Sequence, residues 1–275
     1  MNSLTFLMRA LTCAGTIALG SLPIALVGDM NDVQMGTSIS VAAGMMSGCS
    51  VVLAIESLLA SSCIAVVAGI VFGVLLIHGV QWMLAGREDL TFGDLKGSSA
   101  LGAIVIFLSM LLHSLGEGLS IGVSASEPET SSHSTRLNTV VLVSLGIHNI
   151  PEGMAICMAY RSKGMSIRRA ALCAFLSNLP QPVSALASFC CMRHLETLKF
   201  AVPVGLGMAS GAMSCVVIKE LAPEAFEKVP SKRALVVMLI SALAILFFDA
   251  YHHFGNHEWS ATILPSFGAA VDVEL

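Results

Sequence analysis

Long apolar stretches separated by short polar links run along almost the whole chain. A helix that crosses a bilayer needs about 20 mostly apolar residues, and eight stretches meet that requirement. We therefore predict an all-α, multi-pass membrane protein whose residues 1–275 form a single transmembrane domain. The predicted spans are 5–27, 36–60, 63–85, 98–125, 137–160, 169–192, 199–220 and 234–254.

Composition supports the membrane class and excludes others. Charged residues make up 12% of the chain, against about 25% in a soluble domain. The net charge is −4 and no basic stripe is present, so we expect no nucleic-acid partner. The eight cysteines fall within or at the ends of apolar stretches, where they act as small buried hydrophobes rather than as a disulfide framework.

The distribution of Lys and Arg predicts the orientation. Eight spans put both termini on one side of the membrane, and cytosolic links carry the excess of basic residues. The side opposite the termini receives Arg87, Lys96, Arg161, Lys163, Arg168, Arg169, Lys228, Lys232 and Arg233, whereas the side of the termini receives Arg9, Arg136, Arg193 and Lys199. Both termini are therefore predicted outside the cytosol. The plasma membrane, a plastid envelope and endomembranes all stay open.

Two related motifs lie inside neighbouring spans: HSLGEG at 113–118 and HNIPEG at 148–153. In each, His and Glu stand four residues apart, so both side chains lie on one face of a helix. A carboxylate deep in a membrane indicates a functional site. Imidazole nitrogen and carboxylate oxygen suit zinc and related divalent ions. The sequence therefore predicts a metal site between the two helices, built from His113, Glu117, His148 and Glu152.

Each of the other polar groups in the spans fits either a role in metal transport or an ordinary structural position. Pro180 and Pro182 bracket Gln181 in the sixth span, and Glu220 and Glu224 form a polar patch at the end of the seventh. Glu220 and Glu224 fit either a path for metal out of the site or ordinary interfacial positions. The roles of Glu56, His78 and the histidines of the C-terminal tail stay open in the same way.

These motifs resemble the ZIP (Zrt/Irt-like protein) family of divalent-metal transporters, and the short bacterial and plant-organelle type in particular. The resemblance covers most of the chain from about residue 36, and HSLGEG and HNIPEG match the fourth- and fifth-helix metal motifs. NLPQP resembles the sixth helix, and ASGAM with KELAPEAF resembles the seventh. The resemblance implies eight helices in a 3+2+3 inverted-repeat arrangement. It also implies metal movement into the cytosol by alternating access around a site at mid-membrane.

In many family members the site holds two metals. The resemblance implies a first metal on His113, Glu117, His148 and Glu152, and a second on Asn149 with the two glutamates bridging. Two departures matter here: Ser114 stands where many members have Asn, and Gln181 stands where many have Glu. Two divalent ions would then face only two carboxylates, which is poor charge compensation. We therefore expect one tightly bound metal and a weak or absent second.

The predicted function is transport of Zn²⁺, bound as the substrate, with Cd²⁺, Fe²⁺ and Mn²⁺ left open and no organic cofactor. We expect no enzyme, because HExxH and ExxH metal motifs are absent from the chain. An intramembrane zinc enzyme and a non-transporting metal sensor remain the alternatives. The expected partners are the lipid bilayer and the divalent ion, and a homodimer is left open.

Overall fold

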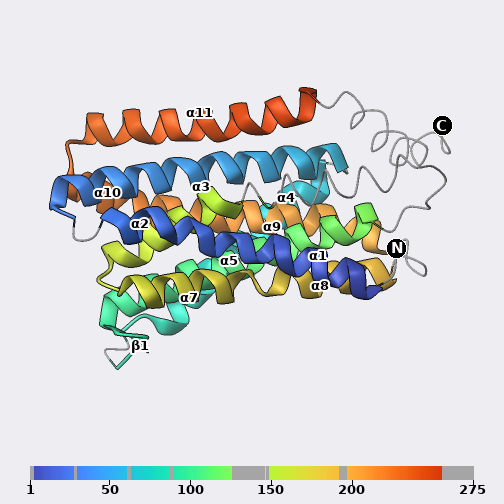
Figure 1. Cartoon of the computed structure of the whole chain (residues 1–275), viewed down its shortest axis with the longest axis horizontal. Coiled ribbons are helices and arrows are strands. Elements are labelled where there is room, and N and C mark those ends of the chain that lie inside the picture. Colours follow the sequence, from blue (N-terminus) through green and yellow to red (C-terminus); the bar gives the residue numbers. More distant parts are fainter. Residues whose placement is uncertain are drawn as a thin grey trace.

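The computed structural model describes residues 3–27, 30–60, 63–86, 89–125, 146, 149–191 and 197–255. Long helices run side by side along one common direction (Figure 1). They are α1 (Ser3–Gly15), η1 (Thr16–Gly20), α2 (Ser21–Val27), α3 (Asp32–Ala60), α4 (Cys63–Leu84), α5 (Gly97–Ala125), a helix over 149–162, α7 (Ile167–Asn178), α8 (Pro180–Cys191), α9 (Thr197–Val216), η2 (Val217–Leu221), α10 (Ala222–Lys228) and α11 (Ser231–Gly255).

Seven helical stretches of the described residues are long and apolar enough to cross a membrane. They correspond to seven of the eight predicted spans, and the prediction of an all-α multi-pass membrane protein is confirmed. Of the remaining span, 137–160, residues 146 and 149–160 are helical, and the others lie outside the described residues. The helical stretch of the seventh span continues past residue 220 to Lys228.

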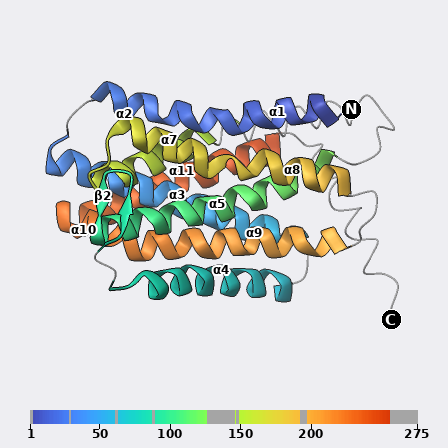
Figure 2. The ribbon, with the colours of Figure 1, turned by 90° about the horizontal axis from the view of Figure 1, so that it is seen from below.

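The contacts between helices form a symmetric pattern. The most extensive ones join α4 to α9, α11 to α3, α5 to α8, α5 to α9, and α3 to α9, while α1 lies along α8 (Figure 2). In an inverted repeat the second span, α3, corresponds to the seventh, α9, and the third span, α4, corresponds to the eighth, α11. Under this correspondence the α4–α9 contact is equivalent to the α11–α3 contact. The α3–α9 contact is symmetric in detail, since the hydroxyls of Ser50 and Ser210 each donate to the other's backbone carbonyl at 2.8 Å. The pattern agrees with an inverted repeat.

Local sequence explains where several helices begin and break. Asn31 and Gln34 form reciprocal side-chain-to-backbone hydrogen bonds of 2.8 and 3.0 Å, a capping box that starts α3. The sixth span is broken at Leu179, because Pro180 lacks a backbone N–H and suits the first position of the new helix α8. The break brings Gln181 into the first turn of α8, inside the bundle.

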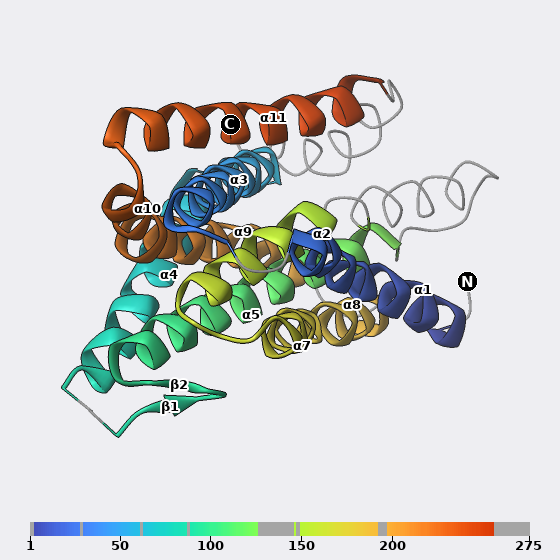
Figure 3. The same cartoon turned by 60° about the vertical axis from the view of Figure 1, so that its left-hand side comes forward.

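The outer helices present their apolar residues outward. In Figure 3, α11 runs along the top of the bundle and α4 lies at its left-hand side, and Ile64, Trp82, Leu239 and Phe247 are among their exposed side chains. Exposed apolar surface of this extent suits lipid rather than water. The polar link after α4 contains a small hairpin that was not predicted, with β1 (Thr91–Phe92) antiparallel to β2 (Leu95–Lys96).

Candidate metal centre

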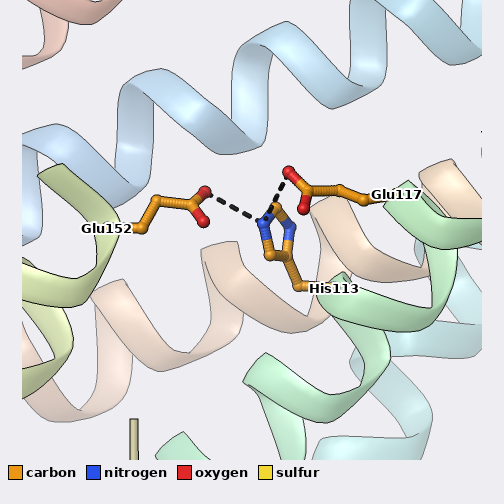
Figure 4. A group of neighbouring side chains, drawn as sticks. All are labelled: His113, Glu117 and Glu152. Carbon is orange, nitrogen blue, oxygen red and sulfur yellow. Dashed lines mark ion pairs between the residues drawn. The ribbon is translucent and has the colours of Figure 1, made fainter. Parts of the chain in front are cut away.

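Three of the predicted ligands meet in the centre of the bundle. His113 and Glu117 lie one turn apart on α5, and Glu152 lies on the helix over 149–162 (Figure 4). The Nε2 atom of His113 lies 3.1 Å from Oε1 of Glu117 and 2.9 Å from Oε1 of Glu152. One nitrogen therefore faces two carboxylates that come from different helices.

The group is sealed from solvent. The exposed fractions of the side chains are 0% for His113, 4% for Glu117 and 2% for Glu152. Their donor atoms lie within 4.8 Å of one another. Ligands held about 2.0–2.2 Å from a tetrahedral zinc ion are separated by roughly 3.3 Å, so the two short distances suit a shared cation. Two buried carboxylates also require positive charge nearby, and a divalent ion would supply it.

The first span approaches the helix of Glu152 very closely. It changes there from α1 to the tighter 3₁₀ segment η1, a feature that often marks a functional hinge. A Cβ atom at Gly153 would clash with the backbone carbonyl of Ile17 in η1, and one at Gly20 would clash with the backbone at Ile150 and Met154. Glycine at 153 is therefore required for this contact, which fixes the backbone of the residue next to Glu152.

A chain of amide groups holds the second oxygen of Glu117. Nε2 of Gln181 donates to Oε2 of Glu117 at 2.7 Å. Nδ2 of Asn178 donates to Oε1 of Gln181 at 3.3 Å and to the backbone carbonyl of Ala14 at 3.1 Å. Ser114 completes the chain, because its hydroxyl donates to Oδ1 of Asn178 at 2.6 Å. The network ties Glu117 to α1, α7 and α8, and it presents a donor, not a carboxylate, beside the glutamate.

Ser114 and Asn149 differ in whether a polar atom is left to bind a cation. The Ser114 hydroxyl is also 3.0 Å from the backbone carbonyl of Ser177, so its hydrogen bonds go to the sixth span. Nδ2 of Asn149 donates to the backbone carbonyl of Cys13 at 3.0 Å. Its Oδ1 atom is buried and has no hydrogen-bond partner among the described residues, so this acceptor is available to a cation.

The remaining predicted residues lie elsewhere. His148 is outside the described residues, as is His257 of the tail, and the side chains of Glu56, His252 and His253 are outside them too. Glu220 and Glu224 belong to a second polar group with Lys163, separate from the three ligands. His78 is exposed on α4, with Nδ1 2.9 Å from the backbone carbonyl of Val74 in its own helix.

Sequence reasoning missed Asn178 and Lys163. Asn178 begins the NLPQP motif and is a buried amide in an otherwise apolar span, which is a usable signal for a polar contact inside the membrane. Lys163 stood in a link of basic residues and carried no signal that separated it from its neighbours. Its partners come from 57 and 61 residues further along the chain.

Known proteins with similar sequences all carry transporter names. A protein of Arabidopsis thaliana named as a putative zinc transporter is 31% identical over 261 residues, 93% of this chain. The zinc transporter GufA of Myxococcus xanthus is 28% identical over 79% of the chain, and the zinc transporter ZIPB of Bordetella bronchiseptica is 29% identical over 64%. The chain spans 41% of the Arabidopsis protein, 87% of GufA and 54% of ZIPB. No family model matches the chain.

Proposed function

We propose that this chain, whose relatives confirm its resemblance to the ZIP family of divalent-metal transporters, carries Zn²⁺ or a related divalent ion across a membrane. The observation that carries the proposal is the buried contact of His113 with Glu117 and Glu152 at 3.1 and 2.9 Å. A carboxylate pair in mid-membrane is costly unless it serves a cation. The names of the three relatives support zinc as the substrate.

The proposed ligands are His113, Glu117 and Glu152, with His148 as the fourth and the Asn149 side-chain oxygen nearby. Two neutral imidazoles and two carboxylates give the site a net charge near −2, which balances one divalent ion. Binding requires both imidazoles neutral and both carboxylates ionised, so metal entry releases protons. A site that can load and unload in this way suits a carrier.

One metal ion is the proposed occupancy. The amide nitrogen of Gln181 hydrogen-bonds Glu117 at 2.7 Å, in the region where a second-site carboxylate stands in many family members. An amide donor directs positive partial charge at that region and adds no negative charge. A second divalent ion there would meet repulsion instead of compensation.

The proposed direction is toward the end of the bundle that carries β1, β2 and α10 (Figure 1). Lys163, Arg169 and Lys228 gather at this end, where each lies within ion-pair distance of an acidic residue: Glu220, Asp94 and Asp32 respectively. The excess of basic residues in these links supports a cytosolic location. Metal would then bind from the opposite side and leave at the basic end.

A transport assay distinguishes a carrier from an enzyme or a metal sensor. Purified protein in liposomes should take up Zn²⁺ down its gradient, as read by a zinc-sensitive dye in the lumen. Glu152→Gln removes a ligand charge at nearly constant size and should abolish uptake. Glu227→Gln removes a charge from α10 outside the centre and serves as the matched control, with uptake expected near wild type. Wild-type uptake by well-folded Glu152→Gln protein would refute the site.

A further inference from the structure

α5 and the helix over 149–162 run antiparallel along one seam that leads away from the metal centre. At one point of the seam His113 faces Glu152. Eleven residues before His113 on α5 lies Gly102, and eleven residues after Glu152 lies Lys163. A Cβ at Gly102 would clash with the side chains of Lys163 and Glu220, so these groups meet again there. Eleven helical residues are about three turns, or roughly 16 Å.

At the point near Gly102, Lys163 links the end of the Glu152 helix to η2 and α10. Its Nζ lies 2.9 Å from Oε2 of Glu220 in η2 and 3.7 Å from Oε2 of Glu224 in α10. The exposed fraction is 11% for the lysine and 17% for each glutamate, so the ions are largely shielded from water. The π-helical turn η2 aims Glu220 at the seam, and π-turns recur at functional sites. We refer to Lys163, Glu220 and Glu224 as the inner ion cluster.

The backbone holds Lys163 in position at the end of its helix. Gly164, with φ of +95°, forms the left-handed cap that follows it. The N–H of Gly164 donates to the carbonyl of Arg161 at 2.9 Å, and that of Met165 to the carbonyl of Tyr160 at 3.1 Å. This pair of bonds is a Schellman motif. A cation at a helix C-terminus is favoured, so the lysine is both fixed and stabilised there.

Between the metal centre and the inner ion cluster the seam is closed. Ile106 on α5 and Ile156 on the Glu152 helix, which lie between these two points in the sequence, are fully buried. The hydroxyls of Ser109 and Tyr160 are buried as well, and neither has a hydrogen-bond partner among the described residues. A buried hydroxyl without a partner is unfavourable, and water entering the seam would satisfy both. The closed seam therefore contains groups that gain from being hydrated.

We propose that the inner ion cluster is the latch that holds the seam closed between the metal centre and the basic end. Its release separates the end of the Glu152 helix from η2 and α10 and lets water reach the ligands. The inference rests on the proposed transport, because only a carrier needs this path to open and close. A latch of this kind shifts a two-state equilibrium between closed and open forms.

Lys219 provides a matched control. It is exposed, lies next to Glu220 in η2, and donates from Nζ to the side-chain oxygen of Gln81 at 2.8 Å. Lys219→Gln and Lys163→Gln each remove one positive charge from the same end of the bundle. Only Lys163→Gln takes the counter-ion from the inner ion cluster, so only this change should open the seam.

The test measures access of a thiol reagent to the seam in metal-free, full-length protein in nanodiscs. A Ser109→Cys reporter is labelled with a water-soluble maleimide, and the rate at residue 109 is read by peptide mass spectrometry, which separates it from the native cysteines. Lys163→Gln should raise that rate about five- to tenfold. Lys163→Arg and Lys219→Gln should leave it at the parent value. An unchanged rate in Lys163→Gln, or an equal rise in Lys219→Gln, overturns the proposal.

A charge-reversed pair separates a latch from general loosening of the fold. Lys163→Glu alone should label fast, and Lys163→Glu combined with Glu220→Lys should return toward the slow parent rate. A double variant that labels as fast as the single one contradicts the latch. The readout needs no metal, so absence of zinc uptake by the wild-type protein would refute the proposed function and leave the labelling result standing.

Discussion

Gln181 on α8 donates a hydrogen bond to Oε2 of Glu117 at 2.7 Å, while Oε1 of the same glutamate lies 3.1 Å from Nε2 of His113. The two oxygens of Glu117 therefore have different surroundings. One faces the proposed metal position, and the other is held by an amide that is itself positioned by Asn178. We therefore propose that Gln181 limits the centre to one metal ion.

Gln181→Glu should increase the number of bound metals from one to two. The substitution replaces a donor by a carboxylate beside Glu117, and the added negative charge compensates a second divalent ion. Equilibrium dialysis with Zn²⁺ would count the equivalents. Release should become slower, because a more negative site holds cations longer, so uptake falls while binding rises.

Gln181→Met is the control for that experiment, since it removes the amide without adding charge. It should leave one bound metal. An unchanged count in Gln181→Glu protein that is folded and monodisperse would show that Gln181 only packs against the broken sixth span.

Gly153→Ala should destabilise the protein and weaken metal binding. The added methyl group would clash with the backbone carbonyl of Ile17 in η1, and overpacking of this kind costs about 1–3 kcal/mol. Gly15→Ala is the matched control, because nothing lies within 4 Å of its Cβ position and its φ of −65° suits alanine. Denaturant midpoints would compare them, and equal midpoints would argue against the close approach of η1.

An ion pair with a predictable titration joins the hairpin before α5 to α7. Nη1 of Arg169 lies 2.6 Å from Oδ1 of Asp94, and its hydrogen bond holds the pKa of Asp94 below the ordinary value. A lowered folded-state pKa contributes stability above the unfolded pKa of about 3.9, and the contribution is lost as pH falls through the folded value.

Arg169→Gln should therefore raise the pKa of Asp94 toward its ordinary value. The carboxyl carbon shift of Asp94, followed by NMR as a function of pH, would measure it. Stability at neutral pH should change little, because the pair is exposed and screened by solvent. A titration identical to that of the wild type would show that Arg169 does not lower the pKa of Asp94.

Topology can be tested with cysteines introduced on the two sides. A cysteine at Ser162, at the end of the Glu152 helix, should react with reagents from the cytosol. A cysteine at Ser132, in the link 126–136, should react only from the opposite side; this link lies outside the described residues. Reaction of both from the same side would contradict the proposed arrangement.

The sequence predicted the class of fold and the meeting of ligands because both depend on simple periodicities. Apolar runs long enough to span a membrane account for the helices. The spacing of four residues stacks His113 on Glu117 within one helix, and their ion-pair distance of 3.1 Å follows from that geometry. The resemblance to the ZIP family was readable from HSLGEG and HNIPEG together with NLPQP, ASGAM and KELAPEAF. The three similar proteins all carry zinc-transporter names.

What the sequence could not predict depends on contacts between distant segments. The 3₁₀ segment η1 exists where the first span approaches Gly153, and neither partner shows this alone. The direction of the Gln181 amide is set by Asn178, which a break at Leu179 brings alongside. Lys163 contacts Glu220, which lies in the π-turn that follows α9. Metal binding by the five predicted ligand residues stays a prediction.

The most direct measurement is anomalous scattering from crystals of the wild-type protein soaked in Cd²⁺. The account predicts one strong peak within coordination distance of Nε2 of His113, Oε1 of Glu117 and Oε1 of Glu152, and no peak of similar strength beside Gln181. Two fully occupied peaks there would contradict the single-metal site. A fully soaked crystal without a peak among these three side chains would contradict the proposed metal centre itself.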